Sequence, residues 1–206
     1  KEQKEIAKAT LAAKGDRVTP VTIRHWIEKQ EHQLEVTANM DSLVNLGSTV
    51  QVLQCDVADT ASVERALQAT CAQHDKIDLL IHGAGFEESK FIHQKDEHSF
   101  GRTFKPKAAA LSVLTAGLKP TRVMTMGSVA GRFGNAGQVD YAMANGFLAG
   151  MARQATTHVN VNWTAWGDIG MAQRGSNAQV LEDAGVTFFY ETTARALIQN
   201  DDGAVI

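Results

Sequence analysis

The 206-residue sequence lacks the features that mark several classes of protein. Its uninterrupted apolar runs are only a few residues long, whereas a helix that spans a bilayer needs about 20 residues. The charged start at residues 1–5 has no apolar segment behind it, so it does not resemble a secretory signal. The two cysteines, Cys55 and Cys71, make neither a disulfide framework nor a metal site, and we expect both to be buried structural thiols. These features predict a cytoplasmic protein with no membrane span and no bound metal.

An excess of charge of one sign is also missing. The chain has 20 Lys and Arg against 23 Asp and Glu, a formal net charge of -3, and its basic residues are scattered. Since a mildly acidic chain has no net attraction for a polyanion, no nucleic-acid partner is expected. Low-complexity repeats are absent, and a hydrophobic fraction of 44% is too high for disorder. What is present is the ordinary composition of an α/β or α-rich domain.

Residues 1–47 carry helical patterns and no pattern that bears chemistry. Apolar residues recur at helical spacing up to Gly15, a residue type that ends helices. Thr19 followed by Pro20 predicts an N-cap with a first-turn proline, after which a second helical stretch continues to residue 47. We therefore expect a helical segment that leads into the fold.

From residue 48 to residue 206, short apolar runs alternate with helical patterns. The candidate strands are residues 50–55, 77–81, 122–126, 159–163 and 204–206. The candidate helices are residues 60–72, 100–118, 139–157 and 179–185. Strands that alternate with helices imply right-handed crossovers and a mostly parallel sheet covered on both faces. No internal repeat and no domain linker are evident.

Small or polar residues follow four of these strands, where a sheet of this kind binds its ligands. The four segments are Cys55-Asp56-Val57, His82-Gly83-Ala84-Gly85, Gly127-Ser128 and Trp163-Thr164-Ala165-Trp166-Gly167. His82 could act as an acid or base, but a structural hydrogen bond is the expected role at the end of a strand.

Three polar residues downstream of a strand have the spacing of a reaction site. Ser128 lies just past the strand, and Tyr141 and Asn145 stand one helical turn apart on the same face. A loop with three glycines between residues 131 and 137 can bring the hydroxyl of Ser128 towards the phenol of Tyr141. By spacing alone, a purely structural role for these side chains stays open.

The block from Met126 to Leu148 resembles the active-site stretch of ketoreductase domains. These domains are short-chain dehydrogenase/reductase folds within type I polyketide and polyunsaturated fatty-acid synthases. Four shorter motifs support the resemblance: Cys55-Asp56-Val57, His82-Gly83-Ala84-Gly85, Lys105-Pro106-Lys107 and Asn162-Trp163-x-x-Trp166. It covers about residues 1–195, and the long helical segment before the first strand is most similar to the fatty-acid branch.

The resemblance implies a Rossmann-like doubly wound parallel sheet and an oxidoreductase. The implied reaction is NADPH-dependent reduction of a 3-ketoacyl thioester to the 3-hydroxyacyl thioester. The acyl chain would be carried by an acyl carrier protein, alongside other synthase domains. The residues that the resemblance implies for binding the cofactor are Asp56, Val57, Gly83, Ala84, Gly85, Trp166 and Met171.

The resemblance also implies a role for each candidate catalytic residue. Tyr141 donates a proton to the substrate carbonyl oxygen, and Ser128 hydrogen-bonds and polarises that carbonyl. The ammonium of Lys107, on the preceding helix, lowers the pKa of the phenol. Asn145 occupies the place of the lysine of more familiar short-chain dehydrogenases and holds water or Lys107. Without the resemblance, Lys107 is read as a solvated helix lysine.

The chain departs from the family pattern in several places. Glu87-Glu88-Ser89 and Phe133 stand where polyketide ketoreductases carry markers of alcohol stereochemistry, so neither configuration is predicted. As residues, Glu87 and Glu88 are read as a solvated loop pair. The usual Trp-Gly-Pro-Trp is Trp163-Thr164-Ala165-Trp166 here, so packing around the nicotinamide is expected to differ.

A larger departure is that no glycine-rich phosphate-binding turn precedes residue 48. If residues 50–55 form the third strand of a sheet with the order 3-2-1-4-5-6, the first two strands are lacking in this chain. We therefore expect a fragment of a longer protein. Expressed alone, it is expected to aggregate or stay unfolded, and neither to bind NADPH nor to reduce a ketoacyl thioester.

Two other functions remain open from the residues. One is a free-standing short-chain alcohol dehydrogenase with another carbonyl substrate, which the lysine on the earlier helix disfavours. The other is a non-catalytic, structural Rossmann-like subdomain of a synthase. The missing phosphate loop favours that reading, whereas the intact set of Lys107, Ser128, Tyr141 and Asn145 disfavours it.

Overall fold

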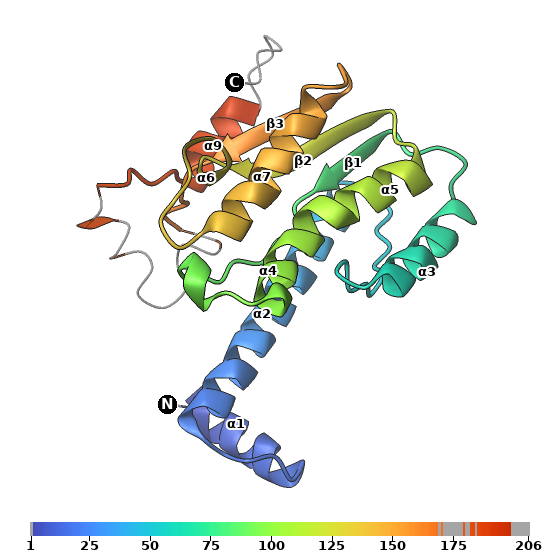
Figure 1. The fold of residues 1–206 in the computed structure, drawn as a ribbon. Coiled ribbons are helices and arrows are strands. Elements are labelled where there is room, and N and C mark those ends of the chain that lie inside the picture. Colours follow the sequence, from blue (N-terminus) through green and yellow to red (C-terminus); the bar gives the residue numbers. More distant parts are fainter. Residues whose placement is uncertain (1, 169, 171–178, 180–181, 184, 199–206) are drawn as a thin grey trace. The chain divides into compact units, whose positions relative to one another are not determined.

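The computed structural model describes residues 2–168, 170, 179, 182–183 and 185–198. Contacts along the chain divide it into two units, Lys1–Leu53 and Gln54–Ile206 (Figure 1). The first unit consists of helices α1 (Glu2–Ala13) and α2 (Pro20–Asn45). The helical reading of this region is therefore confirmed.

Local signals define both helices of the first unit. In α1, Ala7 and Leu11 are buried, and the helix is followed by Gly15 with a positive φ of 77°. The N-cap of α2 is Thr19, whose side chain accepts a hydrogen bond from the Thr22 backbone N–H while the Thr22 side chain accepts one from the Thr19 N–H. The predicted cap and first-turn proline are thus confirmed.

The second unit contains a parallel sheet and its connecting helices. Its elements are α3 (Thr60–Cys71), β1 (Leu79–His82), η1 (Ile92–Gln94), α4 (Glu97–Phe104), η2 (Lys105–Ala109), α5 (Ala110–Leu118), β2 (Arg122–Ser128), α6 (Ala130–Phe133), α7 (Val139–Ala152), β3 (His158–Trp163) and α9 (Glu191–Ile198). The strands lie in the order β1-β2-β3, all parallel. The strands expected at 77–81, 122–126 and 159–163 are confirmed, with ends shifted by one or two residues.

One face of the sheet packs against α5 and α7, which run across it in Figure 1. Leu80 of β1 and Val123 of β2 are register partners on this face, and they pack with Leu111 of α5 and Leu148 of α7. Because side chains alternate along a strand, Leu79 and Ile81 point to the other face, where about half of each residue is exposed. Packing in this core places the carboxyl ends of the strands next to α7.

Two expectations about residues 50–71 are wrong. Residues 50–55 do not form a strand, because a strand needs hydrogen bonds to a neighbour and no described segment pairs with them. Cys71 is exposed and Cys55 only partly buried, so they are not the buried thiols that we expected. Cys71 is the last residue of α3, and its Sγ atom contacts the Gly117 carbonyl oxygen of α5 at 4.0 Å.

Other boundaries differ in detail. The single helix expected over 100–118 is α4, a π-helical turn η2, and α5, and the helix expected to reach residue 157 ends at Ala152. The strand expected at 204–206 lies outside the described residues, and so does much of the helix expected at 179–185.

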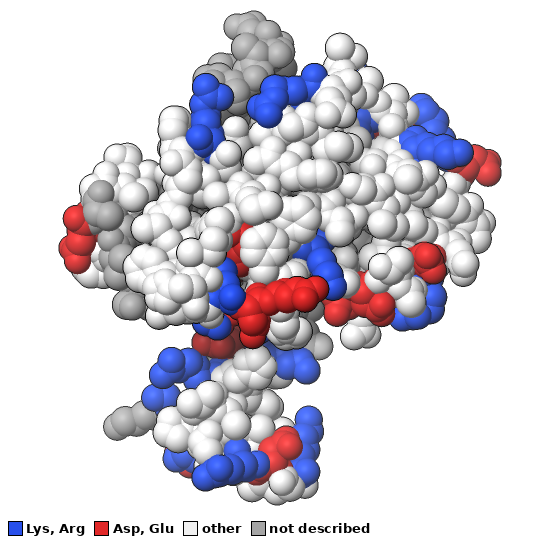
Figure 2. All heavy atoms as spheres, in the orientation of Figure 1, with Lys and Arg blue, Asp and Glu red and all other residues white. Residues whose placement is uncertain are grey.

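Acidic and basic side chains are interspersed on the face that Figure 2 shows. Among the described residues, no helix is both long enough and apolar enough to cross a membrane.

Candidate functional site

The carboxyl ends of β1 and β2 carry the polar residues of the site. His82 ends β1 and pairs in register with Thr125, and Ser128 ends β2 and pairs in register with Trp163. Beyond β1, a Cβ atom added to Gly85 would come 2.9 Å from the Cε atom of Lys107. The backbone after β1 therefore lies directly against the lysine side chain, which only glycine permits.

Lys107 lies in the π-helical turn η2, between α4 and α5. Pro106 in this turn has no backbone N–H, so the regular helical hydrogen bond cannot form there. The His82 Nε2–H donates to the carbonyl oxygen of Lys107 at 2.9 Å, because a carbonyl can only accept. Burial lowers the pKa of His82, which favours this neutral form. The structural role expected for His82 is confirmed.

The side chain of Lys107 points back to the sheet. Its Nζ atom donates to the Met126 carbonyl oxygen at 2.8 Å and lies 5.6 Å from the ring centroid of Tyr141. Only 3% of the residue is exposed, and this burial lowers the pKa of the amine from 10.5 to about 8. The amine is therefore largely charged at pH 7 and loses its charge as the pH rises through about 8.

Tyr141 lies in the first turn of α7, where its pKa is raised. Burial is the largest cause, hydrogen bonding to the side chains of Ser128 and Asn145 acts in the opposite direction, and the negative charge of Glu87 raises the pKa further. The net direction is opposite to the one expected from Lys107 alone, because removing the phenolate from water outweighs the favourable contacts. The phenol is therefore protonated at neutral pH, which is the form that a proton donor needs.

Ser128 and Asn145 flank the phenol. The Ser128 Oγ atom accepts a hydrogen bond from the Ala130 N–H at 3.2 Å. Asn145 is fully buried, and its Nδ2 atom donates to the Tyr141 carbonyl oxygen at 2.8 Å. Its Oδ1 atom has no hydrogen-bond partner among the described residues. Leaving such an acceptor unpaired costs about 1–3 kcal/mol, so a hydrogen-bond donor at this oxygen would stabilise the site.

The structure brings together only some of the residues expected to bind a cofactor. Gly83, Ala84 and Gly85 follow β1, and Trp166 follows β3 with its ring 5.0 Å from that of Trp163. All four therefore lie beyond the carboxyl ends of strands, three after β1 and one after β3, which flank β2.

Asp56 and Val57, also expected to bind the cofactor, do not follow a strand. Asp56 and Val57 precede α3, and the recorded contacts of Asp56 are local: its carboxylate accepts from the Ala58 N–H, and its own N–H donates to the Ser62 Oγ atom. Met171 lies outside the described residues.

The residues beyond the strand ends and around Tyr141 fit the nicotinamide end of a dinucleotide. Gly83 and Gly85 bring the backbone beyond β1 against the side chains of Met126 and Lys107, and the unpaired Oδ1 of Asn145 needs a donor such as a hydroxyl or carboxamide. Lys107 has three N–H donors, of which the described contacts use one. The fit concerns this end of the cofactor only, since the expected phosphate-binding turn is not in the sequence.

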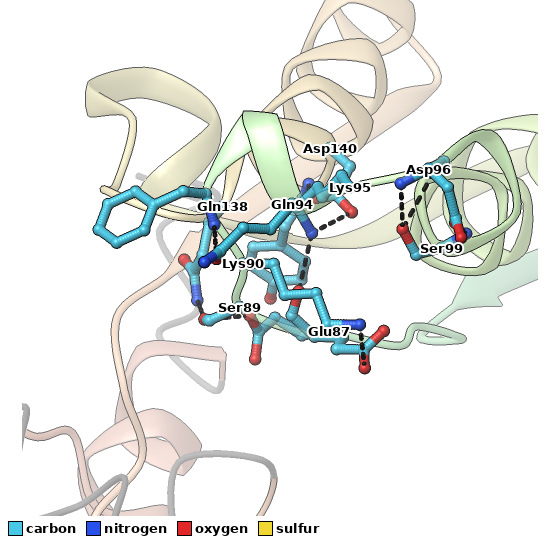
Figure 3. A network of polar contacts seen from close by, with 12 residues as sticks. Glu87, Ser89, Lys90, Gln94, Lys95, Asp96, Ser99, Gln138 and Asp140 are labelled. Carbon is cyan, nitrogen blue, oxygen red and sulfur yellow. Dashed lines mark hydrogen bonds and ion pairs between the residues drawn. The ribbon is translucent and has the colours of Figure 1, made fainter.

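Two functional contacts were missed by sequence reasoning. Lys95 and Asp140, the residue before Tyr141, form a buried ion pair (Figure 3), and the charge of Glu87 raises the pKa of the phenol. Asp140 directly precedes Tyr141 in the characteristic block, which was an available signal, but nothing marks Lys95. The reading of Glu87 as a solvated loop acid overlooked this effect, whereas Glu88 does form a partly exposed ion pair with Lys90 at 2.9 Å.

Comparisons with known proteins agree with this geometry. A family model described as "KR domain" matches residues 6–168. The polyketide synthase PksL of Bacillus subtilis is 30% identical over 191 residues, which are 86% of this chain and 4% of PksL. One chain of a polyunsaturated fatty acid synthase of Thraustochytrium sp. is 30% identical over 147 residues, 68% of this chain and 5% of that one. The reductase FabG of Salmonella typhimurium is 30% identical over 136 residues, 60% of this chain and 56% of FabG.

Solved structures extend the likeness to the fold. A structure of A-type ketoreductases from a modular polyketide synthase has a TM-score of 0.66 and 28% identity, and the match covers 78% of this chain and 36% of that one. A ketoreductase from Streptomyces sp. HK803 has a TM-score of 0.70 at 23% identity, covering 78% and 38%. The chain thus spans well under half of these ketoreductases and a few per cent of the synthases. By its sequence block, its parallel sheet and these matches, the chain belongs to the KR domain family, with the short-chain dehydrogenase/reductase fold of ketoreductases.

Proposed function

We propose that this chain carries the catalytic centre of a ketoreductase module in a polyketide or polyunsaturated fatty-acid synthase. The reaction is the NADPH-dependent reduction of a 3-ketoacyl thioester, held on an acyl carrier protein, to the 3-hydroxyacyl thioester. The observation that carries the proposal is the position of the buried Lys107 amine, 5.6 Å from the ring centroid of Tyr141. The hydrogen bond from the Asn145 Nδ2 atom to the Tyr141 carbonyl oxygen and the position of Ser128 at the end of β2 support it.

The chain's own residues supply the proton and the polarisation. The cofactor, when bound, supplies a hydride for the carbonyl carbon. The Ser128 hydroxyl donates a hydrogen bond to the carbonyl oxygen, and the Tyr141 phenol transfers its proton to that oxygen as negative charge develops there. The Lys107 ammonium stabilises the phenolate that is left. Asn145 supports this exchange, because its Nδ2 atom braces the Tyr141 backbone while its Oδ1 atom stays open.

The residues that hold the cofactor would be those beyond the strand ends, Gly83, Ala84, Gly85 and Trp166. Asp56 and Val57 remain candidates for its adenosine end, and Met171 for the nicotinamide. The preference for NADPH over NADH is part of the proposal.

Removing the phenol tests the proposal in the full-length protein. We expect Tyr141→Phe to lower kcat for a 3-ketoacyl thioester by about 10²–10⁴-fold, because the general acid is lost while the ring stays. The matched control is Tyr190→Phe, which alters the only other tyrosine, an exposed residue. Unchanged turnover in Tyr141→Phe, with the hydrogen-exchange pattern of α7 intact, contradicts the catalytic role.

The two other functions predict different outcomes. A free-standing alcohol dehydrogenase reduces small ketones as well as it reduces carrier-bound thioesters, whereas a synthase module favours the carrier-bound chain. A structural subdomain shows no turnover with either substrate, and Tyr141→Phe then changes nothing. The Lys107 position and the synthase relatives favour the synthase ketoreductase over both of these alternatives.

A further inference from the structure

A buried ion pair joins the loop after β1 to the start of the catalytic helix. The Lys95 Nζ atom contacts the Asp140 Oδ2 atom at 2.7 Å and donates to the Glu88 carbonyl oxygen at 2.8 Å. The two side chains are 3% and 1% exposed. The other carboxylate oxygen of Asp140, Oδ1, accepts the backbone N–H of Tyr141 at 2.9 Å. One carboxylate therefore contacts both the loop and the residue that donates the proton.

Further contacts bind residues 86–91 to the same turn (Figure 3). The Lys90 N–H donates to the Gly137 carbonyl oxygen at 2.9 Å, and the Gln138 Nε2–H donates to the Ser89 Oγ atom at 3.2 Å. The Ser89 hydroxyl in turn donates to the Glu87 carboxylate. The start of α7 thus holds Glu87 through an unbroken series of hydrogen bonds.

Stability alone does not explain the pair. Replacing a buried ion pair by apolar side chains is often neutral or stabilising, because the desolvation of two charges offsets their attraction. The exposed pair of Lys90 and Glu88 lies on the same loop, yet its charges stay hydrated. The Lys95–Asp140 pair is costly to bury, and it contacts both the loop after β1 and the start of α7. Such a pair is suited to holding the two segments in one relative position.

We propose that Lys95 and Asp140 are positioning residues, whose ion pair holds residues 86–91 against the start of α7 and so fixes the position of the Glu87 carboxylate relative to Tyr141. The proposal rests on the proposed function only for its kinetic readout. Two charged groups act on Tyr141: Glu87, from this loop, and Lys107, from η2, whose Nζ atom lies 5.6 Å from the ring centroid. Releasing the loop therefore removes the influence of the Glu87 carboxylate on the phenol and leaves that of the Lys107 amine.

A measurable consequence follows for Tyr141. The carboxylate of Glu87 disfavours the phenolate, so it raises the pKa of Tyr141. If the ion pair positions Glu87, then breaking the pair lowers the pKa of Tyr141, and it does so in the same direction as neutralising Glu87. A pair with only a structural role leaves this pKa unchanged.

The central test is the double variant Lys95→Met/Asp140→Asn in the full-length protein. It removes both charges together, which avoids a single unpaired buried charge, and it keeps the oxygen that accepts the Tyr141 N–H. The matched control is Lys90→Met/Glu88→Gln, which removes the exposed pair of the same loop. The titration of Tyr141 is obtained from tyrosinate absorbance, as the difference between each protein and its Tyr141→Phe counterpart. Hydrogen exchange of residues 86–91 reports the release of the loop.

We expect exchange in residues 86–91 of the double variant to speed up by about tenfold or more, and kcat to fall by about tenfold. The pKa of Tyr141 should fall, and Glu87→Gln should lower it in the wild type but add nothing in the double variant. The control should leave all three quantities unchanged. Ser89→Ala, at an exposed residue, should lower the pKa of Tyr141 in the same direction even if the double variant does not fold.

The proposal is overturned if exchange and the Tyr141 titration of the folded double variant match the wild type. It is equally overturned if Glu87→Gln has its full effect in both backgrounds, or if Ser89→Ala leaves the titration unchanged. The titration and the exchange need no turnover, so they decide this proposal even where the full-length protein reduces no ketoacyl thioester.

Discussion

Helices α2 and α7 show two ways in which this chain makes a helix. The 26 residues of α2 include no buried residue, and the helix begins with a complete capping box at Thr19. The 14 residues of α7 include four buried ones, two of which, Asp140 and Asn145, are polar, and its N-cap residue Gln138 makes no side-chain capping bond. Local contacts therefore define α2, whereas tertiary contacts define α7. The polar side chains that α7 buries both hydrogen-bond the backbone of Tyr141.

The largest effect should come from Lys107, because its burial serves the site and opposes stability. We expect Lys107→Met to lower kcat by about 10²-fold or more, and to move the alkaline limb of the pH–rate profile from near 8 to higher pH, where Tyr141 alone titrates. The matched control is Lys105→Met, at an exposed lysine in the same turn. The measurement is the rate of steady-state ketoreduction between pH 6 and pH 10, about the pH range over which such groups titrate. An unmoved limb would reject the role of the amine.

The same variant should be more stable at neutral pH. The folded protein holds the pKa of Lys107 near 8, below its unfolded value of 10.5, so the wild type carries the full desolvation cost below pH 8. We expect urea unfolding at pH 7 to show a gain of up to about 3 kcal/mol, reduced by the lost hydrogen bond to Met126. The gain should fade as the pH rises from about 8 towards 10.5, where the unfolded amine also loses its proton. A loss of stability at pH 7 would contradict this account.

An intermediate effect is expected where α6 crosses α7. A Cβ atom added to Gly131 would come 2.7 Å from the backbone carbon of Asn145, so Gly131→Ala should force the helices apart and destabilise the protein by about 1–3 kcal/mol. Gly150→Ala is the control within α7, because its Cβ atom would meet only Arg153 at 4.0 Å. That change should stabilise by about 0.5–1 kcal/mol through helix propensity. Equal effects in urea unfolding would show that close packing does not define α7.

The smallest effect should come from the cap of α2. Thr19→Ala removes the acceptor of the Thr22 N–H and should destabilise the start of α2 by about 1 kcal/mol, with no change in turnover. Thr37→Ala in the exposed middle of α2 is the control and should leave the helix at least as stable. Hydrogen exchange of residues 20–26 is the measurement. A drop in ketoreduction would show that α2 contributes to the site.

Much of the fold could be predicted, because each successful prediction used contacts between near neighbours in the chain. The three described strands, the capping of α2 and the turn between Tyr141 and Asn145 all follow from spacing or from a single cap. The strand expected at 50–55 failed for the opposite reason. An apolar run becomes a strand only beside another strand, and the pattern of one segment cannot provide its partner.

The candidate site divides in the same way. Ser128, Tyr141 and Asn145 lie within one block, so their spacing could suggest a shared site, whereas the role of Lys107 came only from the resemblance. Lys107 lies in a π-helical turn, which apolar periodicity does not predict, and this turn places its amine within hydrogen-bond distance of the Met126 carbonyl oxygen. The contact of Lys95 with Asp140 joins residues 45 positions apart, so the apolar periodicity of the sequence could not predict it.

By itself, the sequence determined which segments of the described chain are helices, which apolar runs can become strands and which polar side chains follow them, since those features depend on short-range contacts and on apolar periodicity. Only the tertiary structure decided which charges leave water. Burial lowers the pKa of Lys107, raises that of Tyr141 and joins Lys95 to Asp140, because desolvation depends on every segment that packs around a group.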